Sequence, residues 1–311
     1  MGMFIPEIYR KVVRRTPVEK LPLDWDRMGY VTESFNAWAA DPDFKGWPED
    51  QPTAMEVKFI ARLLNCPPGA RGERSSLCAG FAGARVLDVA CGYGRHALPL
   101  AREYGMKMTG IDISTGLVAA ARRMAAPYQK LSASAESHGT GSTRAGIDVE
   151  YAVGDAREIG REGVFDGAYI AYNTFSLFSD RDAPKVLAAV RRALNPGGRF
   201  FMDLDNKEVM WAEEDSYTDW SLEGKAMKIQ DVCYHRRDSV EVSRDIYIHP
   251  FSLRVEEFIL LKRLYSLGEI RGLLESNGFR VETAYKTFYG NWDPDQASDT
   301  GGKLIVLARK A

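Results

Sequence analysis

The chain has 311 residues, of which 45% are hydrophobic and 27% charged, and its formal net charge is −2. This balance leaves no basic footprint of the kind that nucleic-acid-binding proteins carry, so no nucleic-acid partner is expected. No run of about eighteen apolar residues is present, so no membrane-spanning helix is expected. The four cysteines form no C-x-x-C pair, which argues against a zinc ribbon or a disulfide framework and favours a reducing cytoplasm. The N-terminus lacks the apolar segment of a secretory signal.

Residues 1–52 are rich in aromatic residues and prolines. Such a segment is too apolar for a solvated tail, and its prolines interrupt any long helix. We expect it either to pack on the core or to close over the active site, with Tyr30 and Trp38 as aromatic candidates for ligand contact. Thr53 and Glu56 then have capping-box spacing, which predicts a helix that begins at this point.

The stretch Val86–Leu100 has the sequence VLDVACGYGRHALPL, which predicts a buried strand, a tight glycine turn and a helix. Gly92 and Gly94 let a ligand approach the backbone closely, and the helix behind them offers unpaired N–H groups. The spacing Gly92-x-Gly94-x-x-Ala97 also satisfies the loose dinucleotide fingerprint. Asp88, however, lies inside the strand, where a carboxylate would repel a pyrophosphate but suit a ligand that carries an ammonium or sulfonium group.

These residues resemble the motif hhD-x-x-x-G-x-G-R of the class I S-adenosylmethionine-dependent methyltransferases, in which h is hydrophobic. The resemblance covers roughly residues 84–205 and, more loosely, the C-terminal end. It implies an α/β fold with a doubly wound Rossmann-like sheet and a C-terminal antiparallel strand pair. It also implies S-adenosyl-L-methionine as cofactor and S-adenosyl-L-homocysteine as product. The residues placed at the cofactor are Asp88, Ala90, Gly92, Gly94 and Arg95.

Asp112 and Ile113 end the second predicted strand. Asp112 lies eighteen residues after Gly94, close to the spacing at which an acid in this class of fold binds ribose. A carboxylate accepts hydrogen bonds from both ribose hydroxyls, so Asp112 is a second cofactor candidate. Residues 117–126 predict a helix, and the polar residues 129–146 predict an insertion loop.

Gly154, Asp155 and Ala156 follow the strand predicted over residues 149–153. The resemblance implies that Asp155 accepts a hydrogen bond from the adenine amino group and that the next backbone N–H reaches a ring nitrogen. The three acids after successive strands thus appear in the order in which the family places them.

Tyr172, Asn173 and Phe175 follow the strand predicted over residues 165–171. Ligands of doubly wound sheets bind beyond the carboxyl ends of the strands, so these side chains are expected at the cofactor and the methyl-transfer pocket. Amino DNA methyltransferases carry Asn/Asp-Pro-Pro-Tyr/Phe here, and the absence of proline argues against a nucleobase amino group as substrate. The sequence fixes no catalytic base; Tyr172, Asn173 and His249 are the candidates, and no metal cluster is expected.

Asp203 and Asp205 end the fifth predicted strand, where we expect them to cap backbone groups or contact the acceptor. The pattern then changes to three successive strands without helices, which predicts an inserted antiparallel sheet. This layout is similar to that of the aminosugar N-methyltransferases. The strands are predicted over residues 225–232, 240–248 and 255–264, and a helix with two closing strands completes the chain.

The sequence therefore predicts four parts: a cap segment (1–52), a cofactor-binding core (53–206), an inserted sheet that forms an acceptor-side lid (207–265) and a C-terminal helix with closing strands (266–311). We expect in-line methyl transfer to an amine or hydroxyl of a small molecule. An RNA or protein methyltransferase and a non-catalytic S-adenosylmethionine-binding module are the alternatives, and Asp88 disfavours an NAD enzyme. The expected partners are the small-molecule acceptor and a second copy of the chain in a homodimer, with no membrane.

Overall fold

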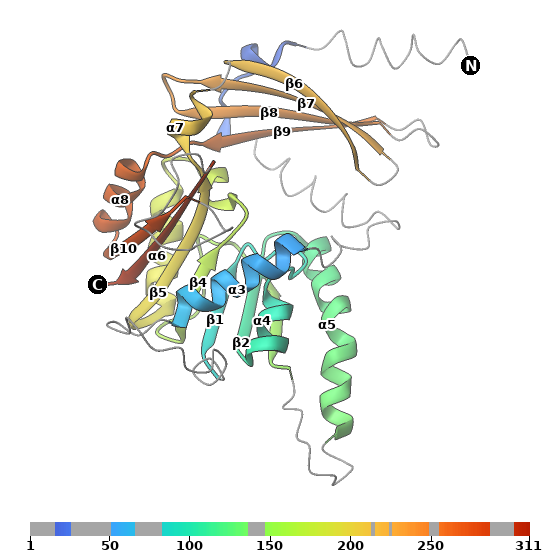
Figure 1. Ribbon diagram of the computed structural model, residues 1–311, viewed down its shortest axis with the longest axis vertical. Coiled ribbons are helices and arrows are strands. Elements are labelled where there is room, and N and C mark those ends of the chain that lie inside the picture. Colours follow the sequence, from blue (N-terminus) through green and yellow to red (C-terminus); the bar gives the residue numbers. More distant parts are fainter. Residues whose placement is uncertain are drawn as a thin grey trace, which may run out of the picture.

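The core of the protein is a seven-stranded sheet of order β10-β11-β5-β4-β1-β2-β3 (Figure 1). The computed structural model describes residues 16–25, 51–65, 83–135, 147–212, 215–223, 226–248, 255–286 and 302–311. The strands of this sheet are β1 (Arg85–Val89), β2 (Lys107–Asp112), β3 (Val149–Val153), β4 (Phe165–Ile170), β5 (Leu194–Asp205), β10 (Phe279–Tyr285) and β11 (Lys303–Lys310). The first five run parallel, and β11 pairs antiparallel with both β5 and β10. The predicted C-terminal antiparallel pair is therefore confirmed.

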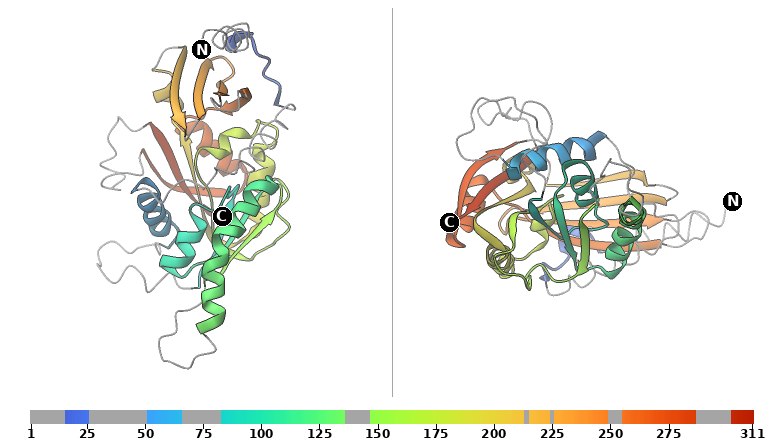
Figure 2. Two further views of the ribbon diagram at one scale, coloured as in Figure 1. Left: turned by 90° about the vertical axis from the view of Figure 1, so that its right-hand side faces the viewer. Right: turned by 90° about the horizontal axis from the view of Figure 1, so that it is seen from below.

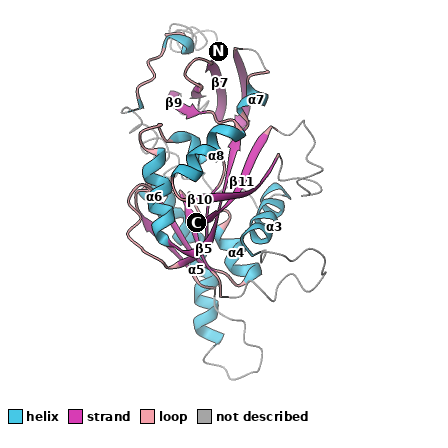
Figure 3. Ribbon diagram, turned by 90° about the vertical axis from the view of Figure 1, so that its left-hand side faces the viewer, coloured by secondary structure: helices cyan, strands magenta, loops and turns pink. Residues whose placement is uncertain are grey.

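Helices cover both faces of this sheet, because parallel strands must be shielded from water on both sides (Figure 3). Every residue of β1 after Arg85 is buried. One apolar cluster joins the sheet to α3 (Gln51–Asn65), α4 (Ala97–Tyr104) and α5 (Thr115–Ala135). A second cluster joins the opposite face to α6 (Ala183–Ala193) and α8 (Leu267–Ser276). These layers make the doubly wound Rossmann-like core that the sequence predicts.

A separate antiparallel sheet of order β6-β7-β8-β9 lies at one end of the core, opposite the end from which α5 projects (Figure 1, Figure 2). Its strands are β6 (Ser216–Glu223), β7 (Ala226–His235), β8 (Val240–Ile248) and β9 (Val255–Arg263). The inserted sheet is confirmed, but β6 was not predicted. Residues 215–222 are all exposed, so β6 lacks the alternation of buried and exposed residues by which a strand is recognised.

The inserted sheet has two unlike faces, because side chains alternate along each strand. The outer face carries Val240 and Val242, which pack against Val18 of the short helix η1 (Val18–Lys20). The other face, called the inner face, carries polar side chains that pair across the strands. Its polar members are Lys228, Gln230, Glu241, Ser243, Asp245 and Lys262.

Two adjacent chain segments connect the inserted sheet to the core. Asn206 and Tyr265 form an isolated parallel bridge, and Lys207 N donates to the Tyr265 carbonyl at 3.2 Å. Lys207 begins the short helix α7 (Lys207–Met210), and its Nζ lies 2.9 Å from Glu269 of α8. Arg263 also approaches Glu269, at 3.5 Å. The chain therefore leaves and re-enters the core at one point.

Three local predictions are wrong. The helix α3 begins at Gln51, so Thr53 lies inside it and is not its N-cap. The helix α5 extends to Ala135, so the predicted loop begins within a helix, and Gln129 Nε2 donates to the Val149 carbonyl at 2.8 Å. The sequence Asn-Pro-Gly-Gly of residues 195–198 predicts a turn before the fifth strand, but these residues lie within β5 at an irregularity in its pairing with β4.

Candidate functional site

The turn after β1 is built from residues with left-handed backbone angles. Ala90, Gly92 and Gly94 have φ values of 58°, 55° and 80°. A Cβ at Gly92 would meet no atom within 4 Å, whereas a Cβ at Gly94 would lie 2.6 Å from Tyr151 Cζ. Gly92 therefore borders open space that a ligand can fill, and Gly94 is required by the tyrosine beneath the turn.

Asp112, at the end of β2, is held against this turn. Its carboxylate accepts hydrogen bonds from Gly92 N and Ser114 N, each at 2.8 Å. Burial raises the pKa of Asp112, and these two hydrogen bonds oppose the rise. Ile113 beside it is 45% exposed, which leaves an apolar side chain next to the buried acid. This pairing of acid and apolar side chain suits a nucleoside, whose ribose is polar and whose base is flat.

Asp88 is buried in β1 on the same side of the core as Cys91 and Tyr169. Its Oδ2 and the Tyr169 hydroxyl are both buried, and no charged side chain among the described residues pairs with this carboxyl. Burial raises the pKa of Asp88 to about 8, the hydroxyl of Tyr169 opposes the rise, and the negative charge of Asp112 adds to it. A buried acid that lacks a compensating charge favours a cationic ligand, so this observation fits a cofactor that carries ammonium and sulfonium groups.

Asp155, after β3, lies beside an arginine that the sequence analysis missed. Arg157 Nη2 lies 2.6 Å from Asp155 Oδ2, and Arg157 Nη1 lies 3.1 Å from Asp182 Oδ2. The hydrogen bonds from Arg157 lower the pKa of Asp155. Gly154 N donates to the Asp112 carbonyl at 3.0 Å, and Ala156 is buried. The structure therefore brings the loop after β3 beside the end of β2.

Tyr172 and Asn173 form a strained turn at the end of β4. Both have left-handed angles, with φ values of 63° and 57°, which is costly for side chains with a Cβ. Asp203 Oδ1 accepts from Tyr172 N at 2.5 Å, and Asp203 Oδ2 accepts from Asn173 N at 3.2 Å. Asp203 therefore caps backbone groups, which is one of the two roles that the sequence predicts for it.

A network of charged and amide groups holds this turn from its far side. Asn173 Nδ2 donates to Asp205 Oδ2 at 2.5 Å, and Asp205 N donates back to Asn173 Oδ1 at 3.1 Å. Lys303 Nζ, on β11, lies 2.8 Å from Asp205 and 3.7 Å from Asp203. The sequence analysis missed Lys303, because a single lysine at the start of a distant strand carries no signal of its partners.

Phe175 lies in the 3-10 helix η3 (Thr174–Leu177) that follows the turn. It is fully buried and packs against Tyr265, with ring centres 6.0 Å apart. The structure thus places Phe175 beneath the turn, whereas Tyr172 is 65% exposed above it.

Arg95 and His96 connect the glycine turn to α3. Arg95 Nε donates to Thr53 Oγ1 at 2.9 Å, and Glu56 Oε2 lies 2.5 Å from Arg95 Nη2 and 2.9 Å from His96 Nε2. The guanidinium of Arg95 also lies 5.1 Å from the centre of the Tyr172 ring. Thr53 and Glu56, expected to cap a helix, instead fix the position of Arg95 between the two turns.

Several expected features fall elsewhere. His249, Tyr30 and Trp38 lie outside the described residues. In the described part of the chain, no group of three or more His, Cys, Asp and Glu side chains is arranged to hold a metal ion. Over the same residues, no helix is both long and apolar enough to span a bilayer.

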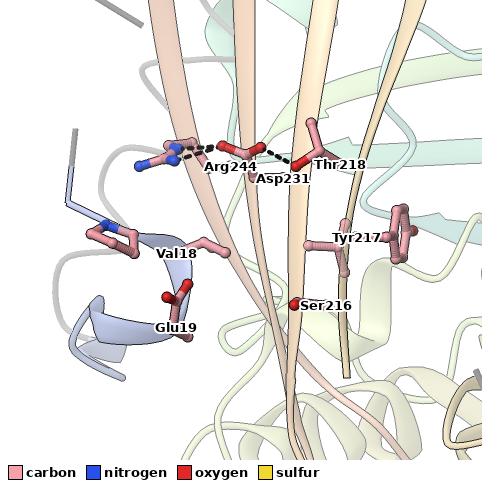
Figure 4. Close-up of a pocket in the computed structure, with 9 residues that line it drawn as sticks. Val18, Glu19, Ser216, Tyr217, Thr218, Asp231 and Arg244 are labelled. Carbon is pink, nitrogen blue, oxygen red and sulfur yellow. Dashed lines mark hydrogen bonds and ion pairs between the residues drawn. The ribbon is translucent and has the colours of Figure 1, made fainter. Parts of the chain in front are cut away.

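A cavity of about 380 Å³ lies between η1 and the outer face of the inserted sheet (Figure 4). Two of its charged groups pair: Arg244 Nη2 lies 2.6 Å from Asp231 Oδ2, and Thr218 Oγ1 donates to Asp231 Oδ1 at 2.9 Å. The cavity lies on the outer face of the sheet, whereas Lys262 lies on the inner face. This cavity is therefore separate from the site built by the strand ends.

Residues 86–198 match the model of a methyltransferase domain family. This match, together with the strand order of the core, decides the family. Residues 86–198 therefore form a domain of the methyltransferase family. The predicted family and its cofactor, S-adenosyl-L-methionine, are confirmed at the level of this domain.

Two solved structures resemble the chain over most of its length. The CcbJ methyltransferase from Streptomyces caelestis is 19% identical, with a TM-score of 0.64, and the match covers 86% of this chain and 100% of that one. CalS10, an amino pentose methyltransferase from Micromonospora echinaspora, is 16% identical, with a TM-score of 0.52 over 94% and 99% of the two chains. At these identities the likeness shows the fold alone.

One curated relative is the S-adenosyl-L-methionine-dependent Diels-Alderase iccD of Talaromyces variabilis. It is 36% identical over 119 residues, which cover 38% of this chain and 35% of the relative. The matched part of the chain spans about a third to a half of the length of these curated relatives.

Proposed function

We propose that this chain transfers a methyl group from S-adenosyl-L-methionine to an amine or hydroxyl of a small molecule by in-line displacement. One observation carries the proposal. The open glycine turn, the buried acids Asp88 and Asp112 and the turn held by Asp203 lie at the carboxyl edge of neighbouring strands β1, β2 and β4. Ligands of doubly wound sheets bind at this edge.

The residues present fit the cofactor. The buried Asp88 would face its cationic part, Asp112 would accept from the ribose hydroxyls, and Asp155 would accept from the adenine amino group. Gly92 leaves room for the ligand beside the backbone. When bound, the cofactor supplies a methyl group on a sulfonium, which is a strong leaving group. The protein then has to align the acceptor and exclude water.

We propose that Tyr172 and Asn173 form the acceptor side of the site together with the inner face of the inserted sheet. Lys262 Nζ lies 2.7 Å from Glu241 Oε1, and the charge of Glu241, with a smaller contribution from Asp205, raises the pKa of Lys262 against the effect of burial. The strand β9 also lies against η3, the 3-10 helix that follows the Asn173 turn. The four-part division of the chain, with the inserted sheet as acceptor-side lid, rests on this contact between β9 and η3.

The proposed acceptor is polar. The inner face offers donors and acceptors in alternation: Gln230 Nε2 donates to Asp245 Oδ1 at 2.7 Å, and Lys228 Nζ lies 3.1 Å from Asp245 Oδ2. Ser243 is fully buried among them with an unpartnered hydroxyl. A cytoplasmic location stays a prediction from the unpaired cysteines.

Calorimetric titration with S-adenosyl-L-methionine, S-adenosyl-L-homocysteine and NAD in parallel tests the cofactor site. We expect the first two to bind and NAD not to bind. Binding of NAD, or of none of the three, would contradict the proposal. A second titration with an Asp112→Ala variant should show affinity lower by about 1–3 kcal/mol, because buried ribose hydroxyls lose their acceptor.

A second candidate function is a reaction that depends on the cofactor without consuming it. The name of the relative iccD, a Diels-Alderase, shows that a similar domain serves such chemistry in another protein. Incubation with a panel of polar amines and alcohols separates the two. Formation of S-adenosyl-L-homocysteine supports methyl transfer, and conversion of a compound without it supports the second candidate.

A further inference from the structure

Arg157 binds carboxylates on two different segments of the chain. Its backbone N and its Nε donate to Asp155 Oδ1, at 2.8 and 3.0 Å, and its Nη2 donates to Asp155 Oδ2 at 2.6 Å. Its Nη1 donates at 3.1 Å to Oδ2 of Asp182, the residue that precedes α6. The guanidinium therefore joins the loop after β3 to the start of α6.

Asp182 holds this arginine from the side opposite Asp155. The side chain of Asp182 is only 12% exposed, and Lys185 Nζ lies 2.7 Å from its Oδ1. The hydrogen bond from Lys185 lowers the pKa of Asp182, so its carboxylate is charged. A guanidinium is planar and carries its donors in a fixed fork, so contacts at both ends fix its orientation. Asp182 therefore sets the orientation in which Arg157 meets Asp155.

The contacts with Arg157 leave the Asp155 carboxylate with little remaining capacity for hydrogen bonds. A carboxylate has about four acceptor positions, and three N–H groups of Arg157 occupy three of them. The hydrogen bonds from Arg157 also lower the pKa of Asp155 against the effect of burial. Because an ionised carboxylate only accepts hydrogen bonds, the one remaining position suits a ligand group that carries a hydrogen atom.

The backbone beside Asp155 borders open space. A Cβ at Gly154 would meet no atom within 4 Å. Gly154 N donates to the Asp112 carbonyl at 3.0 Å, so the open backbone lies beside the end of β2. Ile113, the next residue of that segment, is 45% exposed. An open space with an apolar side chain and a fixed acceptor suits a flat base that carries an amino group.

We propose that Arg157, held by Asp182, determines the base specificity of the cofactor site. It fixes the Asp155 carboxylate so that the remaining acceptor position selects a base with an amino group. Arg157 is thus a positioning residue, which acts through Asp155. The inference rests on the proposed function, in which Asp155 faces the adenine amino group. A base without that group leaves the acceptor position empty, and this loss weakens binding as long as the carboxylate is held in place.

Calorimetric titration with two ligands tests the inference: S-adenosyl-L-homocysteine and its deamino analogue, in which hydrogen replaces the amino group of the base. The wild-type chain should bind the analogue about ten-fold more weakly. Arg157→Ala should reduce this ratio of dissociation constants to about three-fold or less, and Asp182→Ala should reduce it in the same direction. A general loss of stability weakens the binding of both ligands alike, so it does not change the ratio.

The matched control is Arg161→Ala. Arg161 Nη2 lies 2.5 Å from Glu150 Oε1, so this variant also removes an arginine–carboxylate pair next to β3, but it should leave the ratio unchanged. Arg157→Lys separates position from charge. It keeps the positive charge and loses the planar fork, so the ratio should stay low.

The outcomes separate this inference from the proposed function. An unchanged ratio in Arg157→Ala or Asp182→Ala, full restoration of the ratio by Arg157→Lys, or an equal effect of Arg161→Ala overturns the positioning role. A wild-type chain that binds both ligands with equal affinity overturns the inference and leaves the proposed function standing. A wild-type chain that binds neither ligand overturns both.

Discussion

Gly92 and Gly94 lie two residues apart, yet alanine should have different effects at the two positions. At Gly94 the added Cβ would lie 2.6 Å from Tyr151 Cζ, so Gly94→Ala should lower the free energy of unfolding by about 2 kcal/mol. At Gly92 the Cβ meets open space, so only the cost of the left-handed angle remains, about 1 kcal/mol. Gly92→Ala should instead weaken cofactor binding, because its methyl group occupies ligand space. Thermal melts and calorimetry on both variants measure the contrast.

The companion variant for this test is Tyr151→Ala. The double variant should lose less unfolding free energy than the sum of the losses in the two single variants. The reason is that the added Cβ no longer meets the ring once Tyr151 is replaced. If the losses of unfolding free energy in the two single variants simply add in the double variant, Gly94 is required only for its left-handed backbone angle.

Asp88 should release a proton when the cofactor binds. Its pKa of about 8 keeps it protonated in the free protein at pH 7, and a cation beside it lowers that pKa. Calorimetry in two buffers with different ionisation enthalpies should therefore show release of a fraction of a proton, which Asp88→Asn should abolish. Proton uptake, or release that persists in Asp88→Asn, would contradict the contact between Asp88 and the cationic group.

The same residue makes stability depend on pH. The pKa of Asp88 in the folded protein, about 8, exceeds its ordinary value of 3.8, so the folded state binds more protons between these values. The free energy of unfolding should fall as pH rises through this range, and Asp88→Asn should flatten that dependence. Chemical denaturation at a series of pH values measures both slopes.

At the scale of elements, Glu269 joins α8 to the inserted sheet. It closes the capping box with Ser266 and also binds Lys207 Nζ at 2.9 Å. Glu269→Ala removes both contacts and should cost about 1 kcal/mol of unfolding free energy. Glu269→Gln keeps the capping oxygen and loses the ion pair, so it should cost less. Thermal melts at pH 7 compare the two variants.

The difference between wild type and Glu269→Gln should depend on pH. Burial opposes ionisation of Glu269, but hydrogen bonds from Ser266 and Lys207 outweigh it and lower its pKa from 4.5 to about 2. The stabilisation from the charged form is therefore present above 4.5 and should disappear as pH falls toward 2. A difference that is constant over this range would show that the ion pair contributes nothing.

The elements that sequence predicts well are those whose pattern is local. The strand before Gly92 is a short apolar run that contains one acid, Asp88, and stops at a glycine turn, and the structure has β1 at this run. The strand β6 has no such pattern, because its stability comes from pairing with β7 and not from burial of its own side chains. Local pattern also misleads when one residue type has two uses. Thr53 and Glu56 have the spacing of a cap but bind Arg95.

The site was predicted only in part, for the same reason. Asp88, Asp112 and Asp155 lie in, at the end of and after three strands of the parallel sheet, so the strand order alone brings them to the same edge of the sheet. Lys303 is 98 residues from Asp205, and nothing in the sequence between them indicates that they meet. The contact depends on β11 folding back antiparallel beside β5. Side chains supplied across strands in this way become visible only in three dimensions.

At the scale of the whole molecule, the chain leaves the core for the inserted sheet and returns to it at two adjacent residues, Asn206 and Tyr265, which permits a direct test of the sheet's proposed role. Because Asn206 and Tyr265 are paired, a short glycine linker can replace residues 208–264 without moving the ends apart. The shortened chain should fold and bind S-adenosyl-L-methionine with nearly unchanged affinity, but it should not methylate an acceptor. Calorimetry and a product assay measure the two properties.

The control for this deletion is the same shortened chain with Asp112→Ala, which should lose cofactor affinity as the full chain does. A shortened chain that still methylates its acceptor would show that the inserted sheet is not the acceptor-side lid. A shortened chain that folds but no longer binds the cofactor would show that the sheet contributes to the cofactor site itself.

The Tyr151 ring constrains the order in which this protein can evolve. A Cβ at Gly110 would lie 2.6 Å from Tyr151 Cδ1, so two glycines on different segments, Gly94 and Gly110, leave room for one ring. Alanine at Gly94 becomes less costly once residue 151 is smaller, whereas alanine at Gly110 also requires Cys91 to move, because its Cβ would lie 2.8 Å from Cys91 Sγ. We therefore expect the three positions to vary together among descendants of this sequence, with the tyrosine changing first.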